Sequence, residues 1–122
     1  MRLPRRRPSG APYGQNDSDL PRAKRLSFLS DMEQLGEAVE RVSRRMDPAF
    51  RRVNLEILGN TDGFLHAHVW PRFDWEPHEL VRMPVWLHPR DRWTDGQFAL
   101  GPRHDLLREA LGAELDGLRP AR

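Results

Sequence analysis

The longest periodic run of apolar residues extends from Phe28 to Met46. Its apolar positions follow one another at intervals of four or three, and they are Phe28, Met32, Leu35, Val39, Val42 and Met46. This spacing predicts an α-helix with one apolar face, because residues three and four apart are neighbours on a helix surface. Ser27 or Ser30 can cap its start, and Asp47-Pro48 marks its end. The stripe favours packing within the chain, with a contact between two copies as the alternative.

Two shorter segments have the patterns of apolar residues that are typical of β-strands. Residues 53–58 place Val53, Leu55 and Ile57 on one side and polar residues on the other, which predicts a half-buried strand. Residues 59–63 read GNTDG and predict a tight turn. Residues 64–70 predict a second strand, which Pro71 should stop because proline cannot donate to a strand ladder. The two strands should form an antiparallel hairpin.

The C-terminal part of the chain has a long loop and one further helix. Residues 73–103 contain three tryptophans and several prolines without a sustained period, and a loop of this length is usually functional or wraps the edge of a sheet. Asp105 can cap a last helix, which carries a stripe of leucines at Leu107, Leu111, Leu115 and Leu118 and should pack on the domain surface. The expected fold class is therefore α+β, with a long helix packed on a small antiparallel sheet.

Composition restricts the class of protein. A chain of 122 residues makes one small domain, and 38% hydrophobic against 31% charged residues favours a soluble chain. No apolar run approaches the ~20 residues of a spanning helix, so we expect no membrane partner and a cytoplasmic location. The absence of cysteine excludes disulfides, a thiol nucleophile and a cysteine-containing zinc site.

Charge separates the two ends of the chain. Residues 1–25 carry seven basic and two acidic residues together with four prolines, whereas the whole chain has a net charge of only +2. This composition predicts a disordered Arg/Pro-rich tail at 1–25 and a domain at 26–122. A nucleic-acid-binding arm would require interleaved aromatic residues, and Tyr13 is the only one in the tail, so we do not expect nucleic acid as a partner.

His66 and His68 are the main candidates for chemistry. In an extended strand they share a face with Phe64 and Trp70, and their backbones lie ~7 Å apart. A buried imidazole nitrogen needs a hydrogen-bond partner, so two histidines in an apolar strand favour a chemical role over a packing role. A neutral imidazole is a competent nucleophile toward phosphorus.

A metal site is the competing interpretation of the two histidines. It requires a third ligand from the following loop, where His78, Glu76 or Asp74 would have to approach by loop folding. We expect no metal, because such a site gives no role to Pro71, Arg72 or the turn residues. Arg72 itself has two interpretations, a clamp for a phosphate or an exposed surface ion pair.

The run from Phe64 to Arg72, FLHAHVWPR, resembles the signature of the histidine triad family of nucleotide hydrolases and transferases. That signature is His-φ-His-φ-His-φ-φ with φ apolar, commonly followed by Pro-Arg. The upstream Gly59-Asn60-Thr61 matches the Gly-Gln/Asn-Ser/Thr turn of family members, and Pro84-Val85-Trp86 is similar to a bacterial branch. The resemblance covers about residues 26–93.

The resemblance implies a reaction and assigns roles. It implies hydrolysis of nucleoside phosphoramidates or dinucleoside polyphosphates, with His66 as the nucleophile that forms a nucleotidyl-histidine and His68 beside the leaving group. Asn60 and Thr61 match positions that contact phosphate oxygens. It implies a nucleotide or dinucleotide substrate, a homodimer and no cofactor. The alternative is a non-catalytic remnant that binds a nucleotide or a protein partner through the same face.

The chain departs from the family pattern in two places. Phe64 stands where the family has its first histidine, and the loss of an orienting ring can cost ~10²-fold in rate. The tail at 1–25 stands where the family has the strands that wall the nucleoside pocket. The resemblance therefore implies an N-terminally incomplete, partial domain.

Overall fold

The computed structural model describes residues 19–59 and 64–119, and the fold is α+β as expected. Its helices and strands are α1 (Arg22–Met46), β1 (Phe50–Glu56), β2 (His68–Phe73), α2 (Asp91–Thr94) and α3 (Asp105–Leu118), and its 3₁₀ turns are η2 (Val85–Leu87), η3 (Gly96–Phe98) and η4 (Pro102–His104). Within these described ranges, no helix is both long enough and apolar enough to cross a membrane.

Helix α1 starts earlier than its apolar stripe. It begins at Arg22, directly after Pro21, so the predicted caps at Ser27 and Ser30 are wrong and the expected boundary after residue 25 falls inside the helix. The residues added, 22–25, read RAKR and are good helix formers, and proline precedes them where its missing N–H does no harm. The predicted end at Met46 is confirmed, since Asp47 has extended backbone angles.

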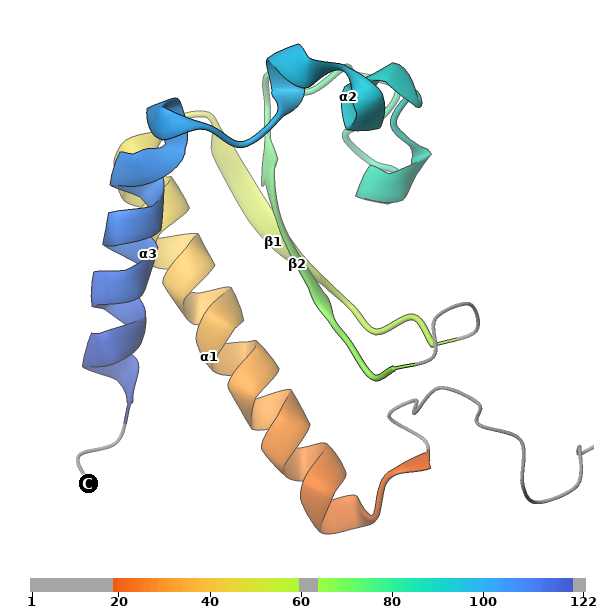
Figure 1. Ribbon diagram of the computed structural model, residues 1–122, viewed down its shortest axis with the longest axis vertical. Coiled ribbons are helices and arrows are strands. Elements are labelled where there is room, and N and C mark those ends of the chain that lie inside the picture. The colour runs from red at the N-terminus through yellow and green to blue at the C-terminus, as the bar shows by residue number, and fades with distance from the viewer. Residues whose placement is uncertain (1–18, 60–63, 120–122) are drawn as a thin grey trace, which may run out of the picture.

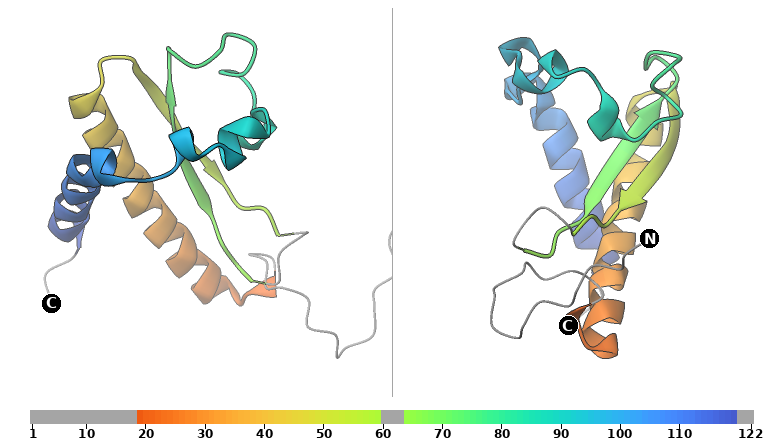
Figure 2. Two further views of the ribbon diagram at one scale, coloured as in Figure 1. Left: turned by 45° about the horizontal axis from the view of Figure 1, so that its top comes forward. Right: turned by 90° about the vertical axis from the view of Figure 1, so that its right-hand side faces the viewer.

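The buried apolar core lies on α1, which has neighbours on two sides. Figures 1 and 2 show α1 between the β1–β2 hairpin and α3, which runs antiparallel to its C-terminal half. The core side chains are Met32, Ala38, Val39 and Val42. Ala38 lies off the predicted stripe and is buried because the helix is covered from two directions, whereas Leu35 and Met46 on the stripe remain 38% and 48% exposed.

The hairpin is antiparallel as expected, but its strands are shifted along the chain. Glu56 pairs with His68 and Val53 pairs with Pro71, with a bulge between Phe50 and Arg52. The prediction that Pro71 stops the second strand is wrong, because β2 continues to Phe73. Proline is accepted in an edge strand, where its nitrogen can face the unpaired side. The ladder starts only at His68, so residues 64–67 precede the strand.

The two faces of the hairpin have different neighbours. Directly paired residues share a face, so Leu55 and Val69 lie on one face while Glu56 and His68 lie on the other. The Leu55 face is turned toward α1, because a Cβ added to Gly36 would lie 3.2 Å from Leu55 Cδ2. Glycine at position 36 therefore permits the close approach of helix and strand. The histidine face is turned away from α1.

Helix α3 packs on the domain surface, as its leucine stripe predicted. Glu114 joins it to α1 through Arg41 and Arg45, at 3.1 and 2.8 Å. Leu107 and Leu111 border an apolar cavity of about 480 Å³ between α1, β2 and α3. No residue of α3 itself is buried. The helix is thus held by its edge contacts and not by a buried apolar seam.

Candidate functional site

A row of rings crosses the histidine face of the hairpin. The ring centroids of Phe64 and His66 lie 4.9 Å apart, those of His66 and His68 5.0 Å, and those of His68 and Trp70 5.2 Å. The two imidazoles meet edge to face at 85°. The structure therefore brings the two histidines that the sequence singled out as candidate site residues together on one face, although His66 precedes β2.

A backbone carbonyl fixes the tautomer of His66. Its Nδ1 lies 3.1 Å from the carbonyl oxygen of Phe64. A carbonyl oxygen only accepts hydrogen bonds, so Nδ1 is the protonated nitrogen in this contact. In the neutral ring the lone pair then belongs to Nε2. That nitrogen has the electronic state required of a nucleophile.

His68 is held by tryptophan. Its ring stacks on Trp70 with an interplanar angle of 5°. Trp70 in turn meets Trp93 of α2 edge to face at 6.1 Å, and its indole nitrogen donates to Glu56 Oε2 at 3.3 Å. Stacking fixes the plane of the imidazole, and the indole is fixed by two further contacts. His68 is thus an oriented, half-buried ring.

Glu56 and Trp93 are parts of this face that sequence reasoning missed. Glu56 is a polar position in the alternating pattern of β1, and its pairing with His68 depends on the register of the hairpin. Trp93 reaches the face from a distant part of the chain. The alternation of Phe64, His66, His68 and Trp70 carried the signal for the row, but no local pattern carried one for these two residues.

Asn60 and Thr61, the predicted phosphate contacts, lie outside the described residues. Phe64, which the resemblance aligns with the first histidine of the signature, is 62% exposed. The Phe64 end of the row is therefore an exposed apolar ring beside His66.

Arg72 is neither a phosphate clamp nor a surface residue, and both sequence interpretations are wrong. Its side chain is buried, with 1% of the residue exposed. Nε donates to both carboxylate oxygens of Glu76 at 3.1 and 3.0 Å, while Nη1 and Nη2 donate to the carbonyls of Met83 and Leu80 at 2.6 and 2.9 Å. The guanidinium binds the loop that follows β2, so its role is structural.

Glu76 completes this buried pair. Burial by itself raises the pKa of its carboxyl, but the hydrogen bonds from Arg72 and from the backbone N–H of Phe73, with the charge of Arg72, lower the pKa below its ordinary value of 4.5. His88 Nε2 lies 3.3 Å from the same carboxylate. Glu76 is therefore an ionised anchor for the loop.

The potential metal ligands of the loop do not gather around the histidine pair. Glu76 is occupied by Arg72, and His78 and Asp74 are exposed. Among residues 19–59 and 64–119, no group of three or more histidine, aspartate or glutamate side chains is arranged to hold a metal ion. The arrangement on the described face is that of two oriented imidazoles flanked by aromatic rings.

Comparison with known proteins finds no family model, curated protein or solved structure that matches this chain. The resemblance to the histidine triad signature thus depends on the residues of the motif and its turn. The comparisons show no family for the chain.

Proposed function

We propose that the chain is a histidine-triad-like nucleotide hydrolase that acts on nucleoside phosphoramidates or dinucleoside polyphosphates through His66. The observation that carries the proposal is the pair of imidazoles on one face, whose ring centroids lie 5.0 Å apart. In this pair, the hydrogen bond from His66 Nδ1 to the carbonyl oxygen of Phe64 leaves the lone pair of the neutral His66 ring on Nε2. The substrate class is taken from the resemblance of residues 64–72 to the histidine triad signature.

The proposed reaction has two balanced steps. Nε2 of His66 attacks the α-phosphorus, a P–N bond to histidine forms, and the P–N or P–O bond to the leaving group breaks. His68, held beside His66 by Trp70, passes a proton to the leaving amine or phosphate. Water then attacks the same phosphorus, the P–N bond to His66 breaks, the nucleoside monophosphate is released, and the proton lost by the water returns to His68.

The test is to trap the nucleotidyl-histidine. We expect denaturation in alkaline detergent during reaction with a labelled adenylated substrate to leave a labelled adduct that is stable in alkali and released by acid, and His66→Ala to abolish both the adduct and turnover. Removal of a covalent nucleophile should lower the rate by ~10³-fold or more. His78→Ala is the matched control, since His78 is an exposed histidine outside the row. Unchanged turnover in His66→Ala would exclude the mechanism.

A second candidate function has its own supporting observation. Phe64 places an apolar ring, 62% exposed, where the family pattern has a histidine, and Trp70 and Trp93 extend the aromatic surface. This surface suits a non-catalytic protein that binds a nucleotide or a protein partner by ring contacts. Nucleotide binding without turnover, equal in wild type and in His66→Ala, would favour this function over hydrolysis.

A further inference from the structure

The apolar cavity of about 480 Å³ lies where the C-terminal half of α1, strand β2 and helix α3 meet. Its walls from β2 and α3 are all apolar or aromatic: Val69, Trp70, Pro71, Phe73, Leu107 and Leu111. A cavity of this size with such a lining is typical of a site for a small molecule. Trp70 also stacks on His68, so it is shared between this cavity and the row of rings.

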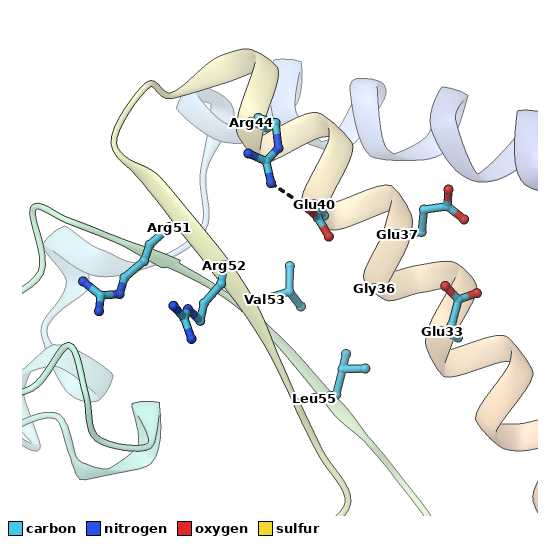
Figure 3. Close-up of a pocket in the computed structure, with 9 residues that line it drawn as sticks. All are labelled: Glu33, Gly36, Glu37, Glu40, Arg44, Arg51, Arg52, Val53 and Leu55. Atoms are coloured by element: carbon cyan, nitrogen blue, oxygen red, sulfur yellow. Dashed lines mark hydrogen bonds and ion pairs between the residues drawn. The ribbon is translucent and has the colours of Figure 1, made fainter.

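A groove of similar size between α1 and β1 has a different lining. Figure 3 shows this groove, of about 450 Å³, and six of the nine residues that line it are glutamates or arginines. Several of these charges already have partners, since Arg44 pairs with Glu40 at 2.7 Å and Arg51 pairs with Asp74 at 3.3 Å. The apolar cavity has no arginine, lysine or glutamate among its lining residues in the described part of the chain. A single charged residue, Asp47, lines it there.

Two polar side chains of α1, Ser43 and Asp47, lie among the apolar walls. They are four residues apart, so they lie on the same side of α1, one turn from each other. Only 5% of Ser43 is exposed, and its hydroxyl makes no hydrogen bond to another residue within 19–59 and 64–119. A buried hydroxyl without a partner costs free energy. Ser43 therefore indicates that the occupant of the cavity brings a polar group to this side.

The charge at this side of the cavity is negative. Asp47 accepts hydrogen bonds from the N–H of Ala49 at 2.8 Å and from Nε1 of Trp75 at 2.9 Å, and both donors are neutral. Asp47 has no ion-pair partner among the described side chains. It is also the C-cap of α1, and the free carbonyls at the end of a helix favour a cation. Arg44 and Arg45 of the last turn pair with other glutamates and do not line the cavity.

We propose that this cavity binds a small primary amine with a flat apolar body, that is, an arylalkyl ammonium ion. The apolar body packs against Trp70, Phe73 and the leucines of α3. The ammonium group has three donors, which suit the Ser43 hydroxyl and the Asp47 carboxylate. Such an amine is protonated at neutral pH, as the side chain of lysine is. The inference does not depend on the proposed hydrolysis and is tested without nucleotide.

Calorimetric titration of the full chain with three probes of similar shape tests the class of ligand. The probes are phenethylamine, phenethyl alcohol and phenylacetate. We expect phenethylamine to bind at least roughly fivefold more tightly than the alcohol, because its hydrogen bonds are charge-assisted. Phenylacetate should bind more weakly than either, because Asp47 repels its carboxylate. Absence of binding by phenethylamine, or equal binding of the three probes, would overturn the proposal.

Substitution of Asp47 tests the source of the preference for an amine. Asp47→Asn removes the charge and keeps the size of the side chain, so the amine should then bind no more tightly than the alcohol. Asp31→Asn is the matched control, since Asp31 is an exposed carboxylate near the other end of α1 and does not line the cavity. An unchanged preference in Asp47→Asn would contradict the assigned role of this carboxylate.

Substitution of Leu107 tests the position of the ligand. Leu107→Trp should fill the cavity and abolish binding of the amine and of the alcohol, and Leu107 is 37% exposed, so α3 has room for the larger ring. Leu106→Trp is the control, since Leu106 is 72% exposed and does not line the cavity. Both variants should keep the circular dichroism of the wild type. Binding by a folded Leu107→Trp variant would place the amine elsewhere and overturn the proposal.

Hydrogen exchange gives a readout that adsorption to the surface would not change. An amine between α1, β2 and α3 must leave before α3 can open. At a concentration ten times its dissociation constant, phenethylamine should therefore slow the exchange of amides in residues 108–118 by about tenfold. Exchange of α3 that does not change while calorimetry reports binding would exclude the cavity as the site.

Discussion

Phe64 contacts the neighbouring imidazole in two ways, through its ring and through its backbone carbonyl. Phe64 contacts His66 at a centroid distance of 4.9 Å, and its carbonyl orients the same ring. The backbone contact is independent of the side chain at position 64. A different side chain at position 64 therefore leaves the orientation of His66 by this carbonyl in place.

On the proposed mechanism, Phe64→His should therefore raise the turnover of an adenylated substrate, by up to ~10²-fold, because it adds a hydrogen-bonding ring beside an imidazole that is already oriented. The measurement is kcat under saturating substrate. Phe64→Leu is the control, which changes the apolar ring without adding a nitrogen and should give no increase. A Phe64→His variant no faster than Phe64→Leu would argue against a supporting role for this position.

Single residues also differ in how much of their environment can be predicted from the sequence. The shared face of His66 and His68 follows from the two-residue period of an extended chain, so it was predictable. The burial of Arg72 was not, because it depends on the carbonyls of Leu80 and Met83 being folded back over the strand end. An arginine that follows a strand has no local pattern that distinguishes these outcomes.

At the level of elements, the loop after β2 is held by one buried ion pair. Arg72 and Glu76 are 1% and 8% exposed, and together they connect β2 to residues 73–83. The loop has only short turns of its own in this part, so its order depends on the pair. The sequence predicted the long loop correctly, but no local pattern predicted the buried Arg72–Glu76 pair that holds it.

Arg72→Met should lower the free energy of unfolding by ~3–5 kcal/mol, because it leaves the Glu76 carboxylate buried without its cation. Urea denaturation followed by tryptophan fluorescence measures this loss. Arg51→Met is the control, since the ion pair of Arg51 with Asp74 is exposed and should contribute less than ~1 kcal/mol. Equal losses in the two variants would contradict a structural role for the buried pair.

The same pair predicts a dependence of stability on pH. The pKa of Glu76 is lowered in the folded state, so the unfolded chain takes up the proton first as the pH falls. Its contribution is fully present above the ordinary pKa of 4.5 and is lost as the pH falls through the lower pKa of the folded state. In urea titrations between neutral and acid pH, Glu76→Gln should therefore reduce the acid-side slope. An unchanged slope would assign the acid sensitivity to other carboxylates.

For the molecule as a whole, stability is concentrated on α1. All four buried apolar side chains of the described residues belong to this helix, while α3 contributes none. Helix α3 is attached by the ion pairs of Glu114 and by leucines around the apolar cavity. Elements with few buried contacts open at lower free energy than the core.

Hydrogen exchange should therefore show α3 opening before α1. We expect amides of residues 108–118 to exchange at least ~10-fold faster, after correction for intrinsic rates, than amides of residues 38–43. Native-state exchange followed by mass spectrometry resolves the two segments. Equal protection of both helices would mean that α1 and α3 open as one cooperative unit.

The sequence by itself determined the elements whose signal is local. The end of α1 follows from its stripe and Asp47-Pro48, α3 from its leucine stripe, and the shared face of the histidines from the alternation of the chain. Tertiary structure alone decided the features that depend on contacts between distant residues. The passage of β2 through Pro71 and the burial of Arg72 are such features. The physical reason is that periodicity reports which side chains share a surface, whereas only the packed chain determines which partner covers it.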